Sequence, residues 1–189
     1  MVVSIVQLIF RYVIHMLNVG VPLFTVYIIG RFIYLKWSHT KIYFKDELLH
    51  ALTVFYFLCL YIITVGRPSM TFSIVMDQNR INAVPFIELM KLLDYGYVTS
   101  FTYNVVGNIL WFMPIGILLP MQMRKYWSIF TIAFCGFCVS LSIEMLQFIF
   151  GTGISDIDDL IINTIGTIIG YIIYKIAAII TVLRRRYEK

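Results

Sequence analysis

Acidic and amide side chains recur at one end of three consecutive apolar runs between residues 101 and 175. They are Asn104 and Asn108 in the first run, Glu144 and Gln147 in the second, and Asp156, Asp158, Asp159 and Asn163 in the third. Carboxylates can hold a hard cation, transfer protons as general acid and base, or accept hydrogen bonds from a ligand. If the three runs cross a membrane one after another, all of these groups fall on the same side and could form one site.

Helical spacing places most of the third set on a single face. At about 100° per residue, one arc of roughly 80° holds Asp156, Asp159, Asn163, Gly166 and Gly170. The outer part of this stripe is polar, whereas the deeper Gly-x-x-x-Gly part permits close contact between helices. Asp158 falls off the stripe, so it is expected to face water or to cap the start of the helix.

The other two runs carry similar stripes. The second stripe consists of Gly136, Ser140, Glu144 and Gln147, and the first consists of Asn104, Gly107, Asn108 and Trp111. Pro114 is expected to kink the first run near its middle. Ionisable groups inside a span are expensive, so three such stripes at one depth predict a single outward-facing pocket. The alternative is a structural hydrogen-bond network that fixes helix packing.

The composition indicates a membrane protein. Of the 189 residues, 60% are apolar and only 13% are charged, and the mean hydropathy is +0.87. A soluble domain has about a quarter of its residues charged, so this chain has too little polar surface to cover a water-exposed fold. The net charge of +5 is typical of cytoplasmic Lys and Arg on a membrane protein. Nucleic-acid binding is not expected, because no basic patch is interleaved with exposed aromatic residues.

No cofactor and no metal site is predicted. His15, His39 and His50 lie on different segments without metal-ligand spacing, and the sequence contains no phosphate-binding glycine motif. Cys135 and Cys138 have the CxxC spacing, but they lie inside an apolar run, where a thiolate is costly. We interpret them as small apolar side chains of a helical bundle.

The apolar runs predict an all-α, polytopic transmembrane helical bundle of about five spans. The spans are expected at residues 19–35, 48–66, 101–120, 127–150 and 159–183. Before them, Gln7, Arg11 and His15 recur at four-residue spacing, which predicts an amphipathic, interfacial segment over residues 1–18. A short interfacial helix is predicted over residues 86–95. The chain divides into residues 1–47, with this segment, the first span and a basic loop, and a membrane domain over residues 48–189.

The distribution of basic residues orients the predicted bundle. Segments 36–47, 121–126 and 184–189 hold nine Lys and Arg, whereas segments 1–18 and 67–100 hold four. The side richer in Lys and Arg is usually cytoplasmic. We therefore expect a multi-pass protein of the cell membrane with its C-terminus in the cytoplasm and the polar cluster on the extracellular side.

The sequence resembles the VanZ-like family of bacterial membrane proteins in four stretches. They are NAVPF (82–86), NVVGNILWFMPIGILLP (104–120), SIEMLQ (142–147) and DIDDLIINTIGTIIGY (156–171). The residues that match family positions are Asn82, Pro85, Asn104, Asn108, Pro114, Gly116, Glu144, Gln147, Asp156, Asp159, Asn163 and Gly166. The resemblance implies a role in resistance to the lipoglycopeptide teicoplanin, although the biochemical mechanism of the family is not established.

Three classes of function are compatible with these residues. In the first, a non-enzymatic pocket binds a lipid-linked cell-wall precursor or the drug at the membrane surface. In the second, an intramembrane enzyme uses Glu144, Asp156 and Asp159 on a lipid phosphate or glycolipid, either with Mg²⁺ or as paired acid and base. The third is a transporter, which is disfavoured because no inverted repeat is apparent. Membrane lipid is the expected partner. The oligomeric state stays open, since Gly166 and Gly170 could pack within one chain or between two.

Overall fold

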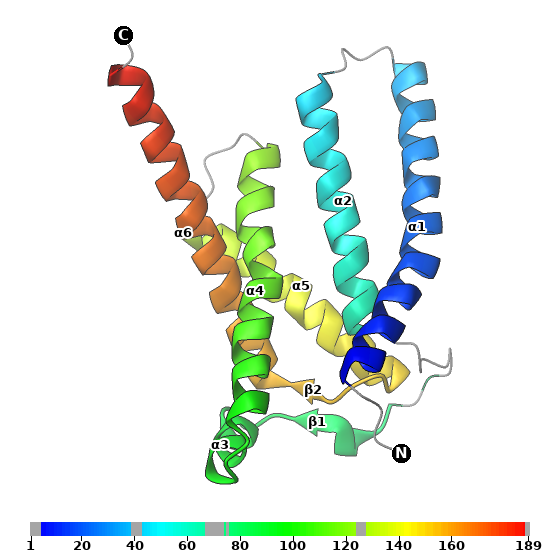
Figure 1. Cartoon of the computed structure of the whole chain (residues 1–189), viewed down its shortest axis with the longest axis vertical. Coiled ribbons are helices and arrows are strands. Elements are labelled where there is room, and N and C mark those ends of the chain that lie inside the picture. Colours follow the sequence, from blue (N-terminus) through cyan, green and yellow to red (C-terminus); the bar gives the residue numbers. More distant parts are fainter. Residues whose placement is uncertain (1–4, 39–42, 67–73, 75, 124–127, 188–189) are drawn as a thin grey trace. The chain divides into compact units, whose positions relative to one another are not determined.

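The computed structural model describes residues 5–38, 43–66, 74, 76–123 and 128–187. Within these residues the chain is almost entirely helical, with one short pair of strands (Figure 1). The elements are α1 (Ile5–Ser38), α2 (Phe44–Thr64), the 3₁₀ helix η1 (Gln78–Arg80), β1 (Ile81–Asn82), α3 (Ile87–Asp94), α4 (Val98–Met123), α5 (Ile129–Phe150), β2 (Ser155–Asp156) and α6 (Ile157–Tyr187).

Among the described residues, five helices are long and apolar enough to cross a membrane, which confirms the predicted bundle. These candidate spans are Phe10–Ser38, Phe44–Thr64, Val98–Gln122, Ile129–Phe150 and Ile157–Arg184. The short helix predicted near residues 86–95 is present as α3. Helix α4 continues unbroken through Pro114 and Pro120.

The N-terminal helix is longer than the span predicted from hydropathy. Helix α1 has 34 residues and joins the amphipathic segment and the first span without a break. At 1.5 Å per residue such a helix is about 50 Å long, whereas the hydrocarbon core is about 30 Å thick. About 20 residues are enough to cross the hydrocarbon core. Helix α1 is therefore long enough for the turn that contains Arg11 to lie outside the core. Residues 1–4 of the predicted interfacial segment lie outside the described residues.

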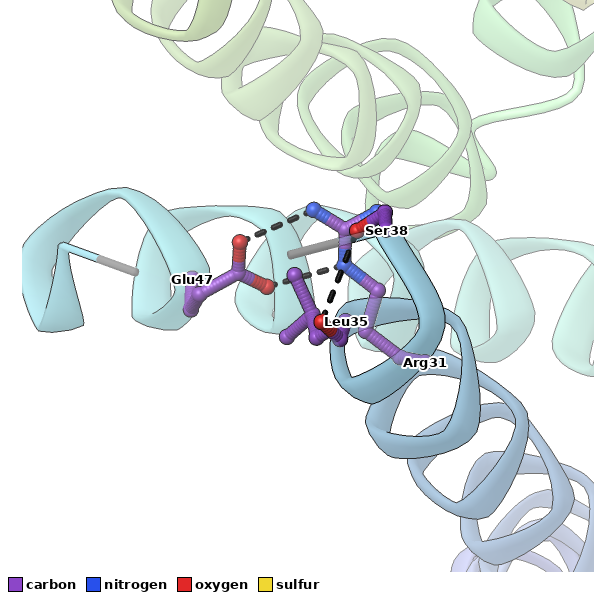
Figure 2. Close-up of polar contacts among 4 residues, drawn as sticks. All are labelled: Arg31, Leu35, Ser38 and Glu47. Carbon is purple, nitrogen blue, oxygen red and sulfur yellow. Dashed lines mark hydrogen bonds and ion pairs between the residues drawn. The ribbon is translucent and has the colours of Figure 1, made fainter. Parts of the chain in front are cut away.

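The chain forms two compact units, and each is described separately. The first unit comprises residues 1–78 and 146–153, and its main feature is the antiparallel hairpin of α1 and α2. Arg31 of α1 and Glu47 of α2 form a two-point ion pair, with Nε–Oε2 and Nη2–Oε1 distances of 2.9 and 2.8 Å (Figure 2). This pair joins the C-terminal part of α1 to the first turn of α2.

The second unit comprises residues 79–145 and 154–189. In this unit α4 packs along α6, α3 contacts α4, and β1 pairs in parallel with β2. The buried apolar side chains include Leu89, Phe112, Ile115, Ile132, Ile143 and Tyr171. Figure 1 shows β1, β2 and α3 together at the end of this unit where α4 and α6 begin.

Glycines allow the helices of the second unit to approach closely. A methyl group on Gly166 of α6 would lie 2.5 Å from the carbonyl oxygen of Ile109 in α4. Gly170 faces the backbone of Met113 in the same way, and Gly136 of α5 faces the side chain of Thr167. The Gly-x-x-x-Gly stripe of α6 is therefore occupied by contacts within the chain.

Candidate functional site

The site begins with the pairing of two strands of two residues each. β1 and β2 are separated by more than seventy positions, and their register places Ile81 opposite Ser155 and Asn82 opposite Asp156. The amide Nδ2 of Asn82 donates a 3.0 Å hydrogen bond to Oδ1 of Asp156. A side-chain contact thus reinforces the short backbone ladder at the entrance to α6.

Asp156 closes the N-terminus of α6. Its Oδ1 also accepts the backbone N–H of Asp158 at 2.9 Å, which satisfies one of the free donors at the start of the helix. The backbone N–H of Asp156 donates to Oε2 of Glu144 at 2.9 Å, and Ser155 Oγ donates to the carbonyl oxygen of Glu144 at 3.2 Å. These bonds tie α5, β2 and the first turn of α6 together.

Asp158 lies inside the unit, unlike the expectation that it would face water or cap the helix. The residue is 1% exposed, and the helix cap is Asp156 instead. Its Oδ1 accepts the backbone N–H of Phe86 at 2.7 Å. The segment between β1 and α3 covers this side of α6, and helical spacing alone cannot indicate such a cover.

The amide–carboxylate pair of Asn108 and Asp159 links α4 to α6. Asn108 Nδ2 lies 2.6 Å from Asp159 Oδ1, and both residues are partly buried. One turn deeper in α6, Asn163 Nδ2 donates to Ser140 Oγ of α5 at 2.8 Å. Thr167 then donates to the carbonyl oxygen of Asn163 at 3.1 Å. Polar contacts therefore extend down the face of α6 that meets α4 and α5.

We call the group formed by Asn82, Asn108, Glu144, Asp156, Asp158, Asp159 and Asn163 the acidic cluster. All of its members belong to the second unit. Glu144 is 3% exposed and, within the described part of the chain, neither Glu144 nor Asp158 forms an ion pair. Two buried acceptors, Asp158 Oδ2 and Asn163 Oδ1, have no hydrogen-bond partner among the described residues.

Two residues of the predicted pocket are placed elsewhere. Asn104 is exposed on α4. Gln147 is buried, but it belongs to the first unit, where its Nε2 donates to the carbonyl oxygen of Thr64 at 3.0 Å. The chain turns after α5 through a Schellman-type end, with Thr152 N–H bonding the Gln147 carbonyl and Gly151 at a φ of 60°.

The chemistry of the acidic cluster is that of hydrogen-bond acceptors, some of them buried and some partly exposed. Its carboxylates bind backbone N–H groups and side-chain amides, which are neutral donors. Among the residues that the structure describes, no three His, Cys, Asp or Glu side chains converge as a metal-ligand group. The arrangement suits a ligand with N–H or O–H donors, and it also suits a carboxyl group that carries a proton.

Comparisons with known proteins found one family and one relative that are similar in sequence. The model of the VanZ/LLP1 family matches residues 53–179, a range that includes the whole acidic cluster. Protein VanZ of Enterococcus faecium is 34% identical to this chain over 74 residues. That match covers 39% of this chain and 45% of the relative, so the chain spans less than half of the length of that protein. No solved structure matches the chain.

Proposed function

The chain belongs to the VanZ/LLP1 family, and on this basis we propose that it contributes to resistance against lipoglycopeptide antibiotics such as teicoplanin. In this proposal the acidic cluster opens toward the outer face of the membrane. There it binds either a lipid-linked cell-wall component or the drug itself. In both cases it changes the binding of the drug to the cell-wall component.

The observation that carries the proposal is the convergence of polar groups from β1, α4, α5 and α6. Asn108, Glu144 and Asp159 come from three different candidate spans. Buried polar groups at this depth are expensive and are usually tied to function. Peptides and glycans present many N–H and O–H donors, which match the partly exposed carboxylates of Asp156 and Asp159.

The direction of the cluster follows from the positive-inside rule. The segment between α4 and α5 contains Arg124 and Lys125, and three consecutive arginines at residues 184–186 precede Tyr187, the last residue of α6. Both segments lie at the opposite ends of their helices from the acidic cluster. With these basic segments in the cytoplasm, the cluster lies on the extracellular side.

A second candidate is an intramembrane enzyme that acts on a lipid phosphate or glycolipid. The burial of Glu144 without an ion pair favours it, because a carboxyl group in such a setting readily holds a proton for general acid catalysis. Asp156 and Asp159 would then position the substrate. Turnover of a lipid phosphate by the purified protein, abolished in Glu144→Gln, would favour the enzyme over the binding protein.

The test is antibiotic susceptibility in a susceptible Gram-positive host. Wild type, Glu144→Gln and Glu88→Gln are expressed at matched membrane levels, and inhibitory concentrations of teicoplanin and vancomycin are measured. Glu88 is the control because it is an exposed carboxylate of the same unit. We expect wild type and Glu88→Gln to protect against teicoplanin and Glu144→Gln to lose protection. Absence of protection by the wild type would refute the proposed function, and full protection by Glu144→Gln would refute the site.

A further inference from the structure

A pocket lies beside α3, and one of its lining residues, Phe86, is hydrogen-bonded to the acidic cluster. Its volume is about 330 Å³, which is near the lower end for small-molecule sites. The lining residues are Pro85, Phe86, Ile87, Met90, Lys91 and Asp94. All of them precede Val98, where the span in α4 begins.

The floor of this pocket is apolar and open to its surroundings. Phe86, Ile87 and Met90 are 50%, 44% and 54% exposed, although each presents a large apolar side chain. Leu89 on the other side of α3 is only 8% exposed. The helix is therefore fixed by one face and offers a second apolar face that no part of the described chain covers.

The chain around α3 has the features of a segment at the membrane surface. Tyr95 and Tyr97 are 73% and 60% exposed and lie between α3 and the first residue of α4. Exposed tyrosines next to a span are typical of the boundary between lipid and water. The pocket is thus placed where acyl chains and headgroups meet.

The rim of the pocket carries one charge of each sign. Lys91 and Asp94 are one helical turn apart, and both line the pocket. Lys91 Nζ lies 2.6 Å from Oε1 of Glu88, and these two side chains are each 53% exposed. An exposed ammonium of this kind can bind a phosphate, while Asp94 can accept hydrogen bonds from an ammonium group.

We propose that this pocket binds one phospholipid of the surrounding bilayer whose headgroup carries both a phosphate and a primary ammonium group. The acyl chain contacts Phe86, Ile87 and Met90, the phosphate binds Lys91, and the ammonium group binds Asp94. The site is separate from the proposed resistance function, since it requires neither a drug nor a cell-wall precursor.

The wall of the pocket is fixed by the acidic cluster. Phe86 adopts a left-handed conformation with a φ of 64°, which is strained for an aromatic residue, and no side chain caps the helix there. Its backbone N–H is held by the buried carboxylate of Asp158. Asp158 is thus a positioning residue for the pocket, which it supports through Phe86.

The experiment is photo-crosslinking in nanodiscs that contain a trace of lipid with a photoactivatable acyl chain. Phosphatidylethanolamine, phosphatidylglycerol and phosphatidylcholine are compared as probes, and labelled peptides are located by mass spectrometry. The variant Met90→Asn makes the floor polar. Met76→Asn is the matched control, because Met76 is 51% exposed, lies outside the pocket, and has a positive φ that asparagine tolerates.

We expect phosphatidylethanolamine to label the segment around Phe86 and Met90 most strongly, and Met90→Asn to reduce this labelling about five-fold. Met76→Asn should label like wild type, and Asp158→Ala should label less although it does not line the pocket. Even labelling of all lipid-facing helices would overturn the proposal. Equal labelling by the three lipids would also overturn it, because the rim charges would then select no headgroup.

Discussion

Adding one methyl group at the contact between α4 and α6 should show how much the close packing of these helices contributes to stability, apart from the effect of helix propensity. The change is Gly166→Ala, and its control is Gly107→Ala. A methyl group on Gly166 would lie 2.5 Å from the carbonyl oxygen and 2.9 Å from the Cα of Ile109, whereas no atom of the described residues lies within 4 Å of one on Gly107. Both substitutions replace glycine by alanine inside a helix of the same unit, so only the packing differs between them.

The geometry sets the size of the effect. The methyl group and the Ile109 oxygen must separate by about 0.9 Å to reach the 3.4 Å at which such a contact becomes ordinary. The carbonyl oxygen belongs to the backbone and the methyl group is bonded to it, so a side-chain rotation cannot relieve the contact and the helices themselves must move. Overpacking of this kind costs about 1–3 kcal/mol. Alanine is favoured over glycine in helices by up to about 1 kcal/mol, so Gly107→Ala should be as stable as wild type or more stable.

Thermal unfolding in detergent micelles, followed by size-exclusion chromatography, measures this difference. We expect Gly166→Ala to melt about 2–12 °C below Gly107→Ala, with no change in oligomeric state. Equal melting temperatures would refute the close packing of α4 on α6. A changed oligomeric state with unchanged stability would instead assign Gly166 to a contact between chains.

Two further predictions concern charged groups outside the acidic cluster. The ion pair of Arg31 and Glu47 is about a quarter exposed on each side, so Glu47→Gln should cost less than about 1 kcal/mol of stability. The exchange of both residues, Arg31→Glu with Glu47→Arg, should recover most of that loss in the same melting assay, and failure to recover it would argue against the pair. The carboxylate of Glu88 raises the pKa of Lys91, so the charged form persists above the ordinary lysine value of 10.5. Lipid labelling at the α3 pocket should therefore persist from neutral pH to the ordinary lysine value of 10.5 and fall only above it, and a loss near neutral pH would contradict the role given to Lys91.

The spans were predictable from hydropathy because each is a long run with few charges. Their ends were less predictable, as α1 shows. Gln7, Arg11 and His15 at four-residue spacing specify a helix with one polar face, but that pattern does not indicate where a helix stops. The segment therefore continues into the first span as one helix.

Within the acidic cluster, the contacts that could be predicted are those between residues on helix faces that pack together. Asn108 and Asp159 lie on stripes that face each other when α4 packs on α6. The contact between Asn82 and Asp156 depends on a pairing of strands two residues long, for which hydrophobic periodicity gives no signal. Gln147 shares a face with Glu144, yet its amide donates to the carbonyl oxygen of Thr64, the last residue of α2.

The hydrogen bonds explain why acidic residues accumulate at this end of the bundle. Non-helical backbone near a membrane needs partners for its N–H groups, since lipid provides none. Glu144 and Asp158 each accept such an N–H, from Asp156 and Phe86 respectively. Asp156 accepts the free N–H of Asp158 in the first turn of α6.

If the acidic cluster had a purely structural role, every buried oxygen in it would be expected to accept a hydrogen bond. Asp158 Oδ2 and Asn163 Oδ1 are buried and have no partner among the described residues, although unpaired buried acceptors are uncommon in folded proteins. Asp158→Asn retains an acceptor for the Phe86 N–H but removes the charge and the second carboxylate oxygen. If this variant is as stable as wild type but no longer protects against the drug, the unpaired oxygen of Asp158 is assigned to ligand binding. If the variant loses both stability and protection, Asp158 is assigned to the support of the fold.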